Sequence, residues 1–308
     1  MIVVVCPGQG SQAPGFLTPW LELPSFKNSL LSMQEASGID LVTHGTISDA
    51  DTIRDTAIAQ PLIVAAGVAT LAAMLDGKSA ADVGIAGVSG HSVGEITAAA
   101  ISGVFDSATA INFVKKRGEA MASAAAIEHT SMAAIVGGEQ SVIEESLRAL
   151  DLEPANYNGG GQIVAAGAAS AIAELQANAP AGSRVIPLQV AGAFHTRYMQ
   201  PAVAELSDFA TQTEPKDPVT KLWTNAGGVE ITSGTQFVEL LVKQVSNPVR
   251  WDLCMAAMLE AGVTGLIEVA PAGTLVGLAK RSMPGIEAVA VKTPENIEAA
   301  LSLINNHR

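Results

Sequence analysis

The sequence predicts an α/β enzyme in which helices pack on a sheet and a small α+β unit interrupts the main domain. Composition is the first observation: 48% of the 308 residues are hydrophobic and only 4% are aromatic, and small apolar residues let helices lie close to a sheet. The second is an alternation of short apolar runs with helical segments. The third is a change of texture near Ala124, which fits one large domain with an insertion, or two modest domains.

Strands and helices alternate up to Ala124. Short apolar runs predict buried strands at 2–5 and 83–88. Three helices are expected in this part of the chain: 61–75, 92–101 and 107–121. Pro61 is tolerated in the first turn of a helix, and Asp106 is a suitable cap for the last of the three.

Beyond Ala124 the expected order is strand, helix, strand, helix, strand. The predicted strands are 132–136, 162–166 and 184–190, and the predicted helices are 140–150 and 170–176. This order suits a small α+β unit of ferredoxin-like type. Helix and strand alternation then resumes, with a short strand at 267–269 that ends in the turn Pro271-Ala272-Gly273.

Charge and cysteine usage exclude several classes of function. The chain has 17 basic and 30 acidic residues, a formal net charge of −13, so we expect no nucleic-acid partner. An acidic protein or a CoA-like partner would need a local basic patch. Cys6 and Cys254 form no CxxC pair, which predicts neither a disulfide framework nor a zinc site and favours the cytoplasm.

No membrane segment is expected. The start of the chain has no charged region of the kind that begins a signal peptide. The longest charge-free run, 56–75, contains Gln60, Pro61 and Gly67, and we interpret it as a buried helix rather than a bilayer span, which needs roughly 20 predominantly apolar residues.

A G-x-S-x-G pattern, Gly90-His91-Ser92-Val93-Gly94, directly follows the second expected strand. Its glycines let the backbone turn sharply and expose the serine hydroxyl, and the next helix N-terminus favours a developing oxyanion. Ser92 and Glu95 also form the capping-box pattern S-x-x-E. A cap does not explain glycines on both sides of the serine, so we expect Ser92 to be a nucleophile.

A serine nucleophile needs a base within hydrogen-bond reach. The chain offers five histidines: His44, His91, His129, His195 and His307. His44 lies in a polar stretch, His129 follows a helix end, and His307 lies in the terminal tail. The His91 side chain should point away from the neighbouring Ser92 hydroxyl. His195 follows a strand, where catalytic groups of α/β folds gather. A lone histidine is more often structural, but elimination leaves His195 as the best base.

Arg117 is a candidate for binding an acidic substrate. The segment from Ser92 to Gly103 is as long as that from Asp106 to Arg117. If the second helix runs antiparallel to the first, a rise of about 1.5 Å per residue brings Arg117 back to the sharp turn at Ser92, here called the elbow. A guanidinium there could hold a carboxylate on the acyl group. The alternative is that Lys115-Lys116-Arg117 is a solvated basic face.

A glycine-rich loop, Gly8-Gln9-Gly10-Ser11-Gln12-Ala13, follows the first strand. It superficially matches the dinucleotide pattern G-x-G-x-x-A, but Pro14-Gly15 interrupts the helix that should receive the pyrophosphate. The loop could instead present a backbone N–H to an oxyanion beside the elbow.

Further motifs follow in order along nearly the whole chain: Ala59-Gln60-Pro61, Arg117-Gly118 with Met121, Asn156 with Asn158, Gln162-Ile163-Val164, Gly192-Ala193-Phe194-His195-Thr196, Asn247-Pro248-Val249-Arg250-Trp251, and Glu268-Val269 with Pro271. Together with the loop and the elbow, they resemble the malonyl-CoA:acyl carrier protein transacylase family. The resemblance implies a hydrolase-like α/β domain over 1–123 and 191–308 with a parallel sheet, interrupted by a ferredoxin-like subdomain over 124–190.

The resemblance also implies roles for individual residues. Ser92 would be the nucleophile and His195 the base, and Arg117 would clamp a carboxylate. The backbone N–H groups of Gln9 and Val93 would form the oxyanion hole. The backbone carbonyl of Gln244 would orient the histidine, which gives a Ser–His dyad without a buried acid. The remaining implied substrate-binding residues are Gln60, Asn156, Asn158 and Gln162, which would line the cleft, and His91 and Phe194, which favour malonyl over methylmalonyl.

The implied reaction is transfer of malonyl from malonyl-CoA to an acyl carrier protein, with no metal or bound cofactor. A monomer is our default expectation, and cysteine usage favours the cytoplasm. Docking of an acidic carrier would use local positive groups such as Lys115, Lys116, Arg197, Lys280 or Arg281. Two rivals remain at this point. One is a plain serine hydrolase, although no HGGG oxyanion loop occurs, and the other is a carrier-binding module without activity.

Overall fold

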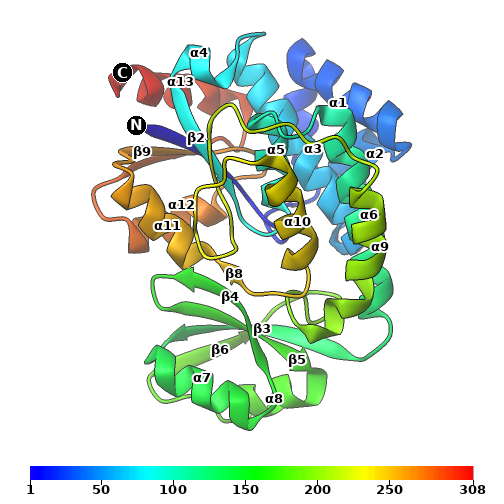
Figure 1. Cartoon of the computed structure of the whole chain (residues 1–308), viewed down its shortest axis with the longest axis vertical. Coiled ribbons are helices and arrows are strands. Elements are labelled where there is room, and N and C mark those ends of the chain that lie inside the picture. The colour runs from blue at the N-terminus through cyan, green and yellow to red at the C-terminus, as the bar shows by residue number, and fades with distance from the viewer. Residues whose placement is uncertain (308) are drawn as a thin grey trace.

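The computed structural model describes residues 1–307, whose strands form two sheets (Figure 1). In the first sheet all five strands are parallel. Their order across the sheet is β10 (Glu287–Ala290), β9 (Gly265–Glu268), β1 (Ile2–Cys6), β2 (Ile85–Gly90) and β7 (Lys221–Trp223). The parallel sheet of the α/β prediction is therefore confirmed.

Helices cover both faces of this sheet. They are α1 (Pro24–Ser37), α2 (Leu41–Thr46), α3 (Thr56–Leu75), α4 (Ala80–Val83), α5 (Gly94–Ile101), α6 (Ser107–Ala125), α9 (Gln200–Ala210), α10 (Gly234–Gln244), α11 (Trp251–Glu260), α12 (Thr274–Ser282) and α13 (Ile297–Asn306). Short 3₁₀ turns lie at η1 (Thr18–Glu22), η2 (Thr52–Arg54), η3 (Arg197–Met199) and η4 (Pro294–Asn296).

Strand β1 shows why the sheet is buried on both faces. Ile2, Val4 and Cys6 belong to the large apolar core that includes α3 and α6, whereas Val3 and Val5 pack with the core of α11 and α12. Successive strand residues point to opposite faces. A continuous apolar run is therefore what a central parallel strand requires.

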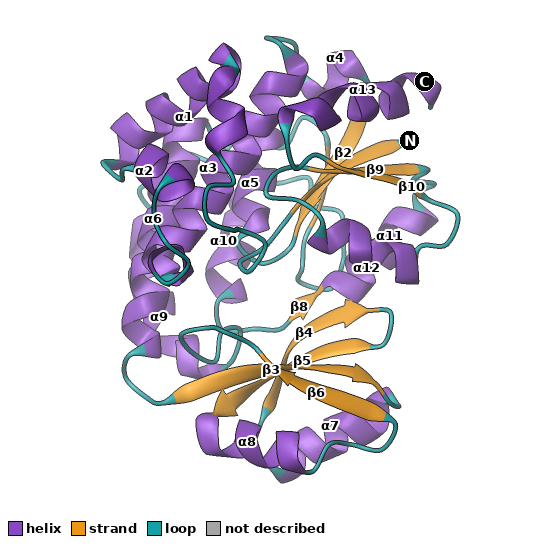
Figure 2. Ribbon diagram, turned by 180° about the vertical axis from the view of Figure 1, so that it is seen from behind, coloured by secondary structure: helices purple, strands orange, loops and turns teal. Residues whose placement is uncertain are grey.

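The second sheet lies at the other end of the molecule (Figure 2). Its strand order is β6 (Ser183–Pro187), β3 (Thr130–Gly137), β5 (Gln162–Ala168), β4 (Glu153–Gly159) and β8 (Val249–Arg250). The first four pair antiparallel, and β8, from much later in the chain, adds parallel to β4. Helices α7 (Gln140–Ala149) and α8 (Ala169–Ala177) cover one face with apolar residues such as Ile143 and Leu175.

Several element boundaries differ from the sequence predictions. Helix α3 begins at Thr56 rather than Pro61, because Asp55 caps it by accepting from Ala57 N, and Pro61 lies inside the helix. Helix α5 begins at Gly94 rather than Ser92. Strand β4 was not expected, and strand β6 ends at Pro187 rather than at residue 190.

Among residues 1–307, one helix is long and apolar enough to cross a membrane. It is α3, Thr56–Leu75, and 83% of its most apolar window is buried inside the protein. A buried core helix passes the same test of length and composition, so this is weak evidence for a span.

Candidate active site

Ser92 sits on the turn between β2 and α5 with a left-handed backbone, at a φ of 53°. A non-glycine residue needs support in this conformation, and Asn225 supplies it by accepting from Ser92 N at 2.8 Å. The two flanking glycines allow close packing. A Cβ on Gly94 would overlap the carbonyl of Cys6, and a Cβ on Gly90 would overlap the backbone of Gly94.

The capping-box alternative does not describe this turn. The N-cap of α5 is Val93, which makes no side-chain cap hydrogen bond. The Ser92 hydroxyl lies instead beside His195 and Arg117. Glu95 is 1% exposed and accepts from the backbone N–H of Asn225. The serine hydroxyl is therefore left for contacts outside its own helix.

His195 is held between the Ser92 hydroxyl and a backbone carbonyl. Its Nδ1 lies 2.8 Å from the oxygen of Gln244, and its Nε2 lies 2.7 Å from Ser92 Oγ. A carbonyl can only accept, so in the neutral ring Nδ1 carries the proton and Nε2 is the acceptor. Burial and the nearby Arg117 charge lower the pKa of His195 to about 3. The ring is therefore neutral at pH 7, and its unprotonated Nε2 faces the Ser92 hydroxyl within hydrogen-bond reach.

Arg117 reaches the elbow from α6 and is fully buried. Its Nη1 donates to Gln60 Oε1 at 2.6 Å, and its Nη2 donates to Gln244 Oε1 at 2.8 Å and lies 3.4 Å from Ser92 Oγ. Within residues 1–307, its Nε is buried without a partner. Burial lowers the Arg117 pKa to about 10, so the group remains a cation. A buried cation whose Nη2 lies beside Ser92 suits an anionic acyl group.

Most of the other predicted residues lie around this centre. Gln9 lies in the loop whose Gly8 packs against His91, and its side chain contacts Arg54 O and Thr56 Oγ1. In the part of the chain described, the backbone N–H groups of Gln9 and Val93 donate no hydrogen bond. Both amides are thus available to an oxyanion.

The second sheet contributes a connected polar group. His91 Nε2 lies 2.9 Å from Asn158 Oδ1, and Asn158 Nδ2 donates to Gln162 Oε1 at 3.3 Å. Asn156 is buried in β4, where it pairs with β5 and β8, and no hydrogen bond joins its side chain to Ser92 among the described residues. Phe194 is buried directly before His195.

Three parts of the site were not predicted from the sequence: the Glu95 carboxylate, Asn225 and the Gln244 side chain. Gln244 Nε2 donates to Glu95 Oε2, to Asn225 Oδ1 and to Ser92 O. A usable signal existed for Asn225, because it follows strand β7, and catalytic groups of α/β folds gather after strands. Glu95 gave no such signal, since the pattern S-x-x-E favoured a cap.

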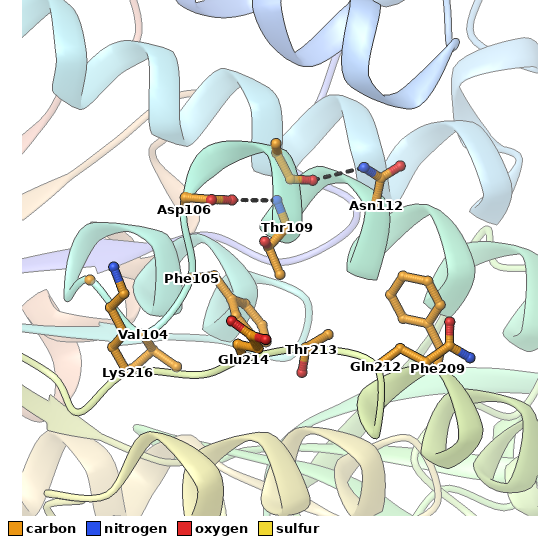
Figure 3. A pocket seen from close by; sticks show the side chains of 12 residues that line it. Val104, Phe105, Asp106, Thr109, Asn112, Phe209, Gln212, Thr213, Glu214 and Lys216 are labelled. Atoms are coloured by element: carbon orange, nitrogen blue, oxygen red, sulfur yellow. Dashed lines mark hydrogen bonds between the residues drawn. The ribbon is translucent and has the colours of Figure 1, made fainter.

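Two pockets differ in their relation to the predicted site, and neither is lined by Ser92, His195 or Arg117. A pocket of about 350 Å³ lies between the Gln9 loop and residues 188–190, which directly follow strand β6. A larger groove of about 770 Å³, at the start of α6, contains none of the predicted site residues (Figure 3). There Asp106 accepts from Thr109 N and Asn112 donates to Ala108 O, so these polar groups serve their own helix.

The comparisons with known proteins identify the family of the chain. The family model described as "Acyl transferase domain" matches residues 3–294. The chain belongs to this acyl transferase family. The malonyl CoA-acyl carrier protein transacylase of Mycolicibacterium smegmatis is 45% identical over 287 residues, which cover 92% of this chain and 98% of that protein.

Solved structures are similar over almost the whole chain. The crystal structure of MCAT from Mycobacterium tuberculosis aligns with a TM-score of 0.91 at 43% identity, over 98% of this chain and 99% of that one. A malonyl-transacylase solved in complex with a holo acyl-carrier protein of a type II PKS aligns with a TM-score of 0.91 at 28% identity, over the same shares. The chain is therefore an acyltransferase with the fold of these enzymes.

Proposed function

We propose that this acyltransferase moves a malonyl group from malonyl-CoA to the phosphopantetheine thiol of an acyl carrier protein. The observation that carries the proposal is the contact of Ser92 Oγ with His195 Nε2 at 2.7 Å beside the buried Arg117 cation. The names of the relatives support the same substrate and acceptor.

The reaction has two halves. In the first, His195 takes the Ser92 proton, the oxygen attacks the thioester carbonyl, the carbon–sulfur bond breaks, and CoA leaves with that proton. In the second, the carrier thiol gives its proton to His195 and attacks the malonyl-serine, and Ser92 recovers the proton as it leaves. Because the histidine is neutral before each half, it is ready to act as a base both times.

The remaining roles follow from position. The N–H groups of Gln9 and Val93 would stabilise the tetrahedral oxyanion, as backbone donors do in other acyl transfers. Arg117, through its free Nε and its Nη groups, would bind the malonyl carboxylate. Gln60 holds this guanidinium in place, so it would act on the substrate through Arg117.

Further parts of the proposal concern the whole protein. The order β6-β3-β5-β4, with α7 and α8 on one face, supports a ferredoxin-like subdomain close to residues 124–190. Helix α6 continues to Ala125, so the first boundary would fall slightly later than residue 123. We also propose that the enzyme acts in the cytoplasm as a monomer, without a metal or bound cofactor.

Intact-mass spectrometry tests the proposal. The wild type, incubated with malonyl-CoA, should gain a malonyl group and keep it until a carrier thiol arrives, whereas Ser92→Ala should gain none. Methylmalonyl-CoA and acetyl-CoA, run in parallel, report acyl selectivity. A hydrolase would release free malonate promptly without a thiol acceptor, and a non-catalytic module would never become acylated; either result would remove the proposal.

A further inference from the structure

A buried hydrogen-bond network lies behind the Ser92 elbow, and the proposed mechanism gives its central carboxylate no role. Glu95 on α5 is 1% exposed. Its Oε1 accepts from the backbone N–H of Asn225 at 2.7 Å, and its Oε2 accepts from Gln244 Nε2. A buried carboxylate is costly unless such donors satisfy it, so its presence beside the site calls for a reason.

The carboxylate determines how the Gln244 amide is oriented. An ionised carboxylate only accepts, so the amide nitrogen of Gln244 must face Glu95. The amide oxygen then faces Arg117 Nη2, at 2.8 Å. In the reverse orientation, the Gln244 amide oxygen would face the Glu95 carboxylate, and the amide nitrogen would face the Arg117 guanidinium, so neither contact could be a hydrogen bond.

The same carboxylate supports the elbow through Asn225. With its backbone held by Glu95, the Asn225 side chain accepts from Ser92 N at 2.8 Å and donates to Gly90 O at 2.7 Å. These two bonds join the residue before the turn to the residue at its apex. Glu95 is thus joined to both the nucleophile and the guanidinium, and touches neither reacting atom.

We propose that Glu95 is a positioning residue that fixes the Gln244 amide, so that Arg117 faces the carboxylate of the acyl group and the enzyme favours acidic over neutral acyl groups. The inference rests on the proposed function, because it deepens the role given there to Arg117. A positioning role of this kind should alter selectivity more than it alters the chemical step at Ser92.

The network also has a titration that supports the inference. Burial raises the pKa of Glu95 to about 7. The other titratable groups around it do not change near neutrality: Arg117 on α6 has a pKa of about 10, the Cys254 thiol on α11 about 12, and His195 about 3. Protonated Glu95 can donate as well as accept, so the Gln244 amide loses its fixed orientation as the pH falls below about 7.

Glu95→Gln tests the inference, with Glu268→Gln as its matched control. Glu268 is likewise fully buried, but its carboxylate accepts from Gly273, Leu275 and Val276 N–H groups at the start of α12. Among the described residues it makes no hydrogen bond to Ser92, Asn225 or Gln244. Rates of acylation by malonyl-CoA and by acetyl-CoA would be measured from about pH 6 to about pH 8.5. Titrations of CoA itself and of His195 cancel in the ratio of the two rates.

In the wild type, the malonyl-to-acetyl ratio should fall as the pH drops through about 7, because Glu95 becomes protonated. Glu95→Gln should lower the ratio about tenfold at pH 8, as expected for disturbing one hydrogen bond to a charged group, and should make it independent of pH. Glu268→Gln should keep the wild-type ratio and its pH dependence.

Equal losses on both substrates in Glu95→Gln would mean that Glu95 only supports folding, and would overturn the inference. A wild-type ratio that is flat across this pH range would overturn it too, and that measurement needs no variant to fold. In either case Ser92 would still become malonylated, so the proposed function is judged separately by the Ser92→Ala comparison.

Discussion

At the scale of single residues, the site depends on which side chains are left unsatisfied before substrate binds. The two Nη groups of Arg117 donate hydrogen bonds to Gln60 and Gln244, while its Nε has no partner in the described chain. A buried charge that keeps a free donor favours a ligand able to neutralise it. The acyl group, rather than the protein, would then complete the coordination of Arg117.

Arg117→Ala should therefore change substrate choice. Malonyl acylation of Ser92 should fall about a hundredfold or more, the effect expected when one partner of a buried charge pair is lost. Acetyl acylation should fall much less, because acetyl has no carboxylate to bind. Single-turnover acylation rates with both CoA esters measure this, and each variant's acetyl rate is the control for general damage. Equal losses on both substrates would refute the clamp.

The residues that the sequence could predict are those whose roles have local signals. Ser92 was predicted from its flanking glycines, and His195 by elimination among the five histidines, with its place after an expected strand in its favour. For Arg117, helix lengths left a solvated basic face as the alternative, and the family resemblance gave the role of clamp. The residue does reach the Ser92 turn, with Nη2 at 3.4 Å from Ser92 Oγ. Glu95 was not predicted, because its partners Asn225 and Gln244 come from segments more than a hundred residues away. No local pattern distinguishes a buried network carboxylate from a helix-capping one.

At the scale of elements, prediction failed for a strand that depends on pairing with other strands rather than on an apolar sequence. Strand β4, Glu153–Gly159, contains proline, asparagine and glycine, which are poor strand formers. It exists because β5 and β8 pair with it on both sides, and its ladder with β5 contains two irregularities. The strands that were predicted from apolar runs, such as β1 and β2, are those whose side chains fill the core. Pairing with a distant segment leaves no comparable mark on the sequence.

The elbow between β2 and α5 gives a prediction at this scale. Gly94→Ala should destabilise the protein by about 2 kcal/mol or more, because its Cβ would overlap the carbonyl of Cys6 on the central strand. Gly277→Ala, in helix α12, is the matched control. No atom lies within 4 Å of its added Cβ, so it should gain about 0.5–1 kcal/mol from helix propensity. Urea unfolding compares the two, and equal stabilities would contradict the packing argument.

At the scale of the whole molecule, the net charge of −13 makes the position of the few free cations important. Three of the predicted docking residues are already engaged. Lys115 donates to Ser37 O, Lys116 pairs with Glu205, and Arg197 pairs with Asp151 and Glu153. Lys280 and Arg281, at the end of α12, are exposed and make no ion pair within residues 1–307. They are the better candidates for an acidic carrier.

The position of Arg281 connects this surface with the site. The Arg281 side chain lies against Gly160, in the turn between β4 and β5. Asn158, near the end of β4, contacts His91, the residue before Ser92. A carrier held by Lys280 and Arg281 would thus dock beside the turn after Asn158, whose side chain contacts the residue next to Ser92. On an acidic protein, a local cation of this kind attracts an acidic partner and slows its release.

Arg281→Glu should therefore raise the KM for the carrier about tenfold at low salt, and less at high salt because salt screens exposed charges. The KM for malonyl-CoA in the first half-reaction should not change. Arg184→Glu changes the net charge by the same amount, at an exposed arginine on β6 at the far edge of the second sheet. If both variants weakened the carrier equally, the general charge of the protein would be responsible. If neither had an effect, α12 would not be the docking surface.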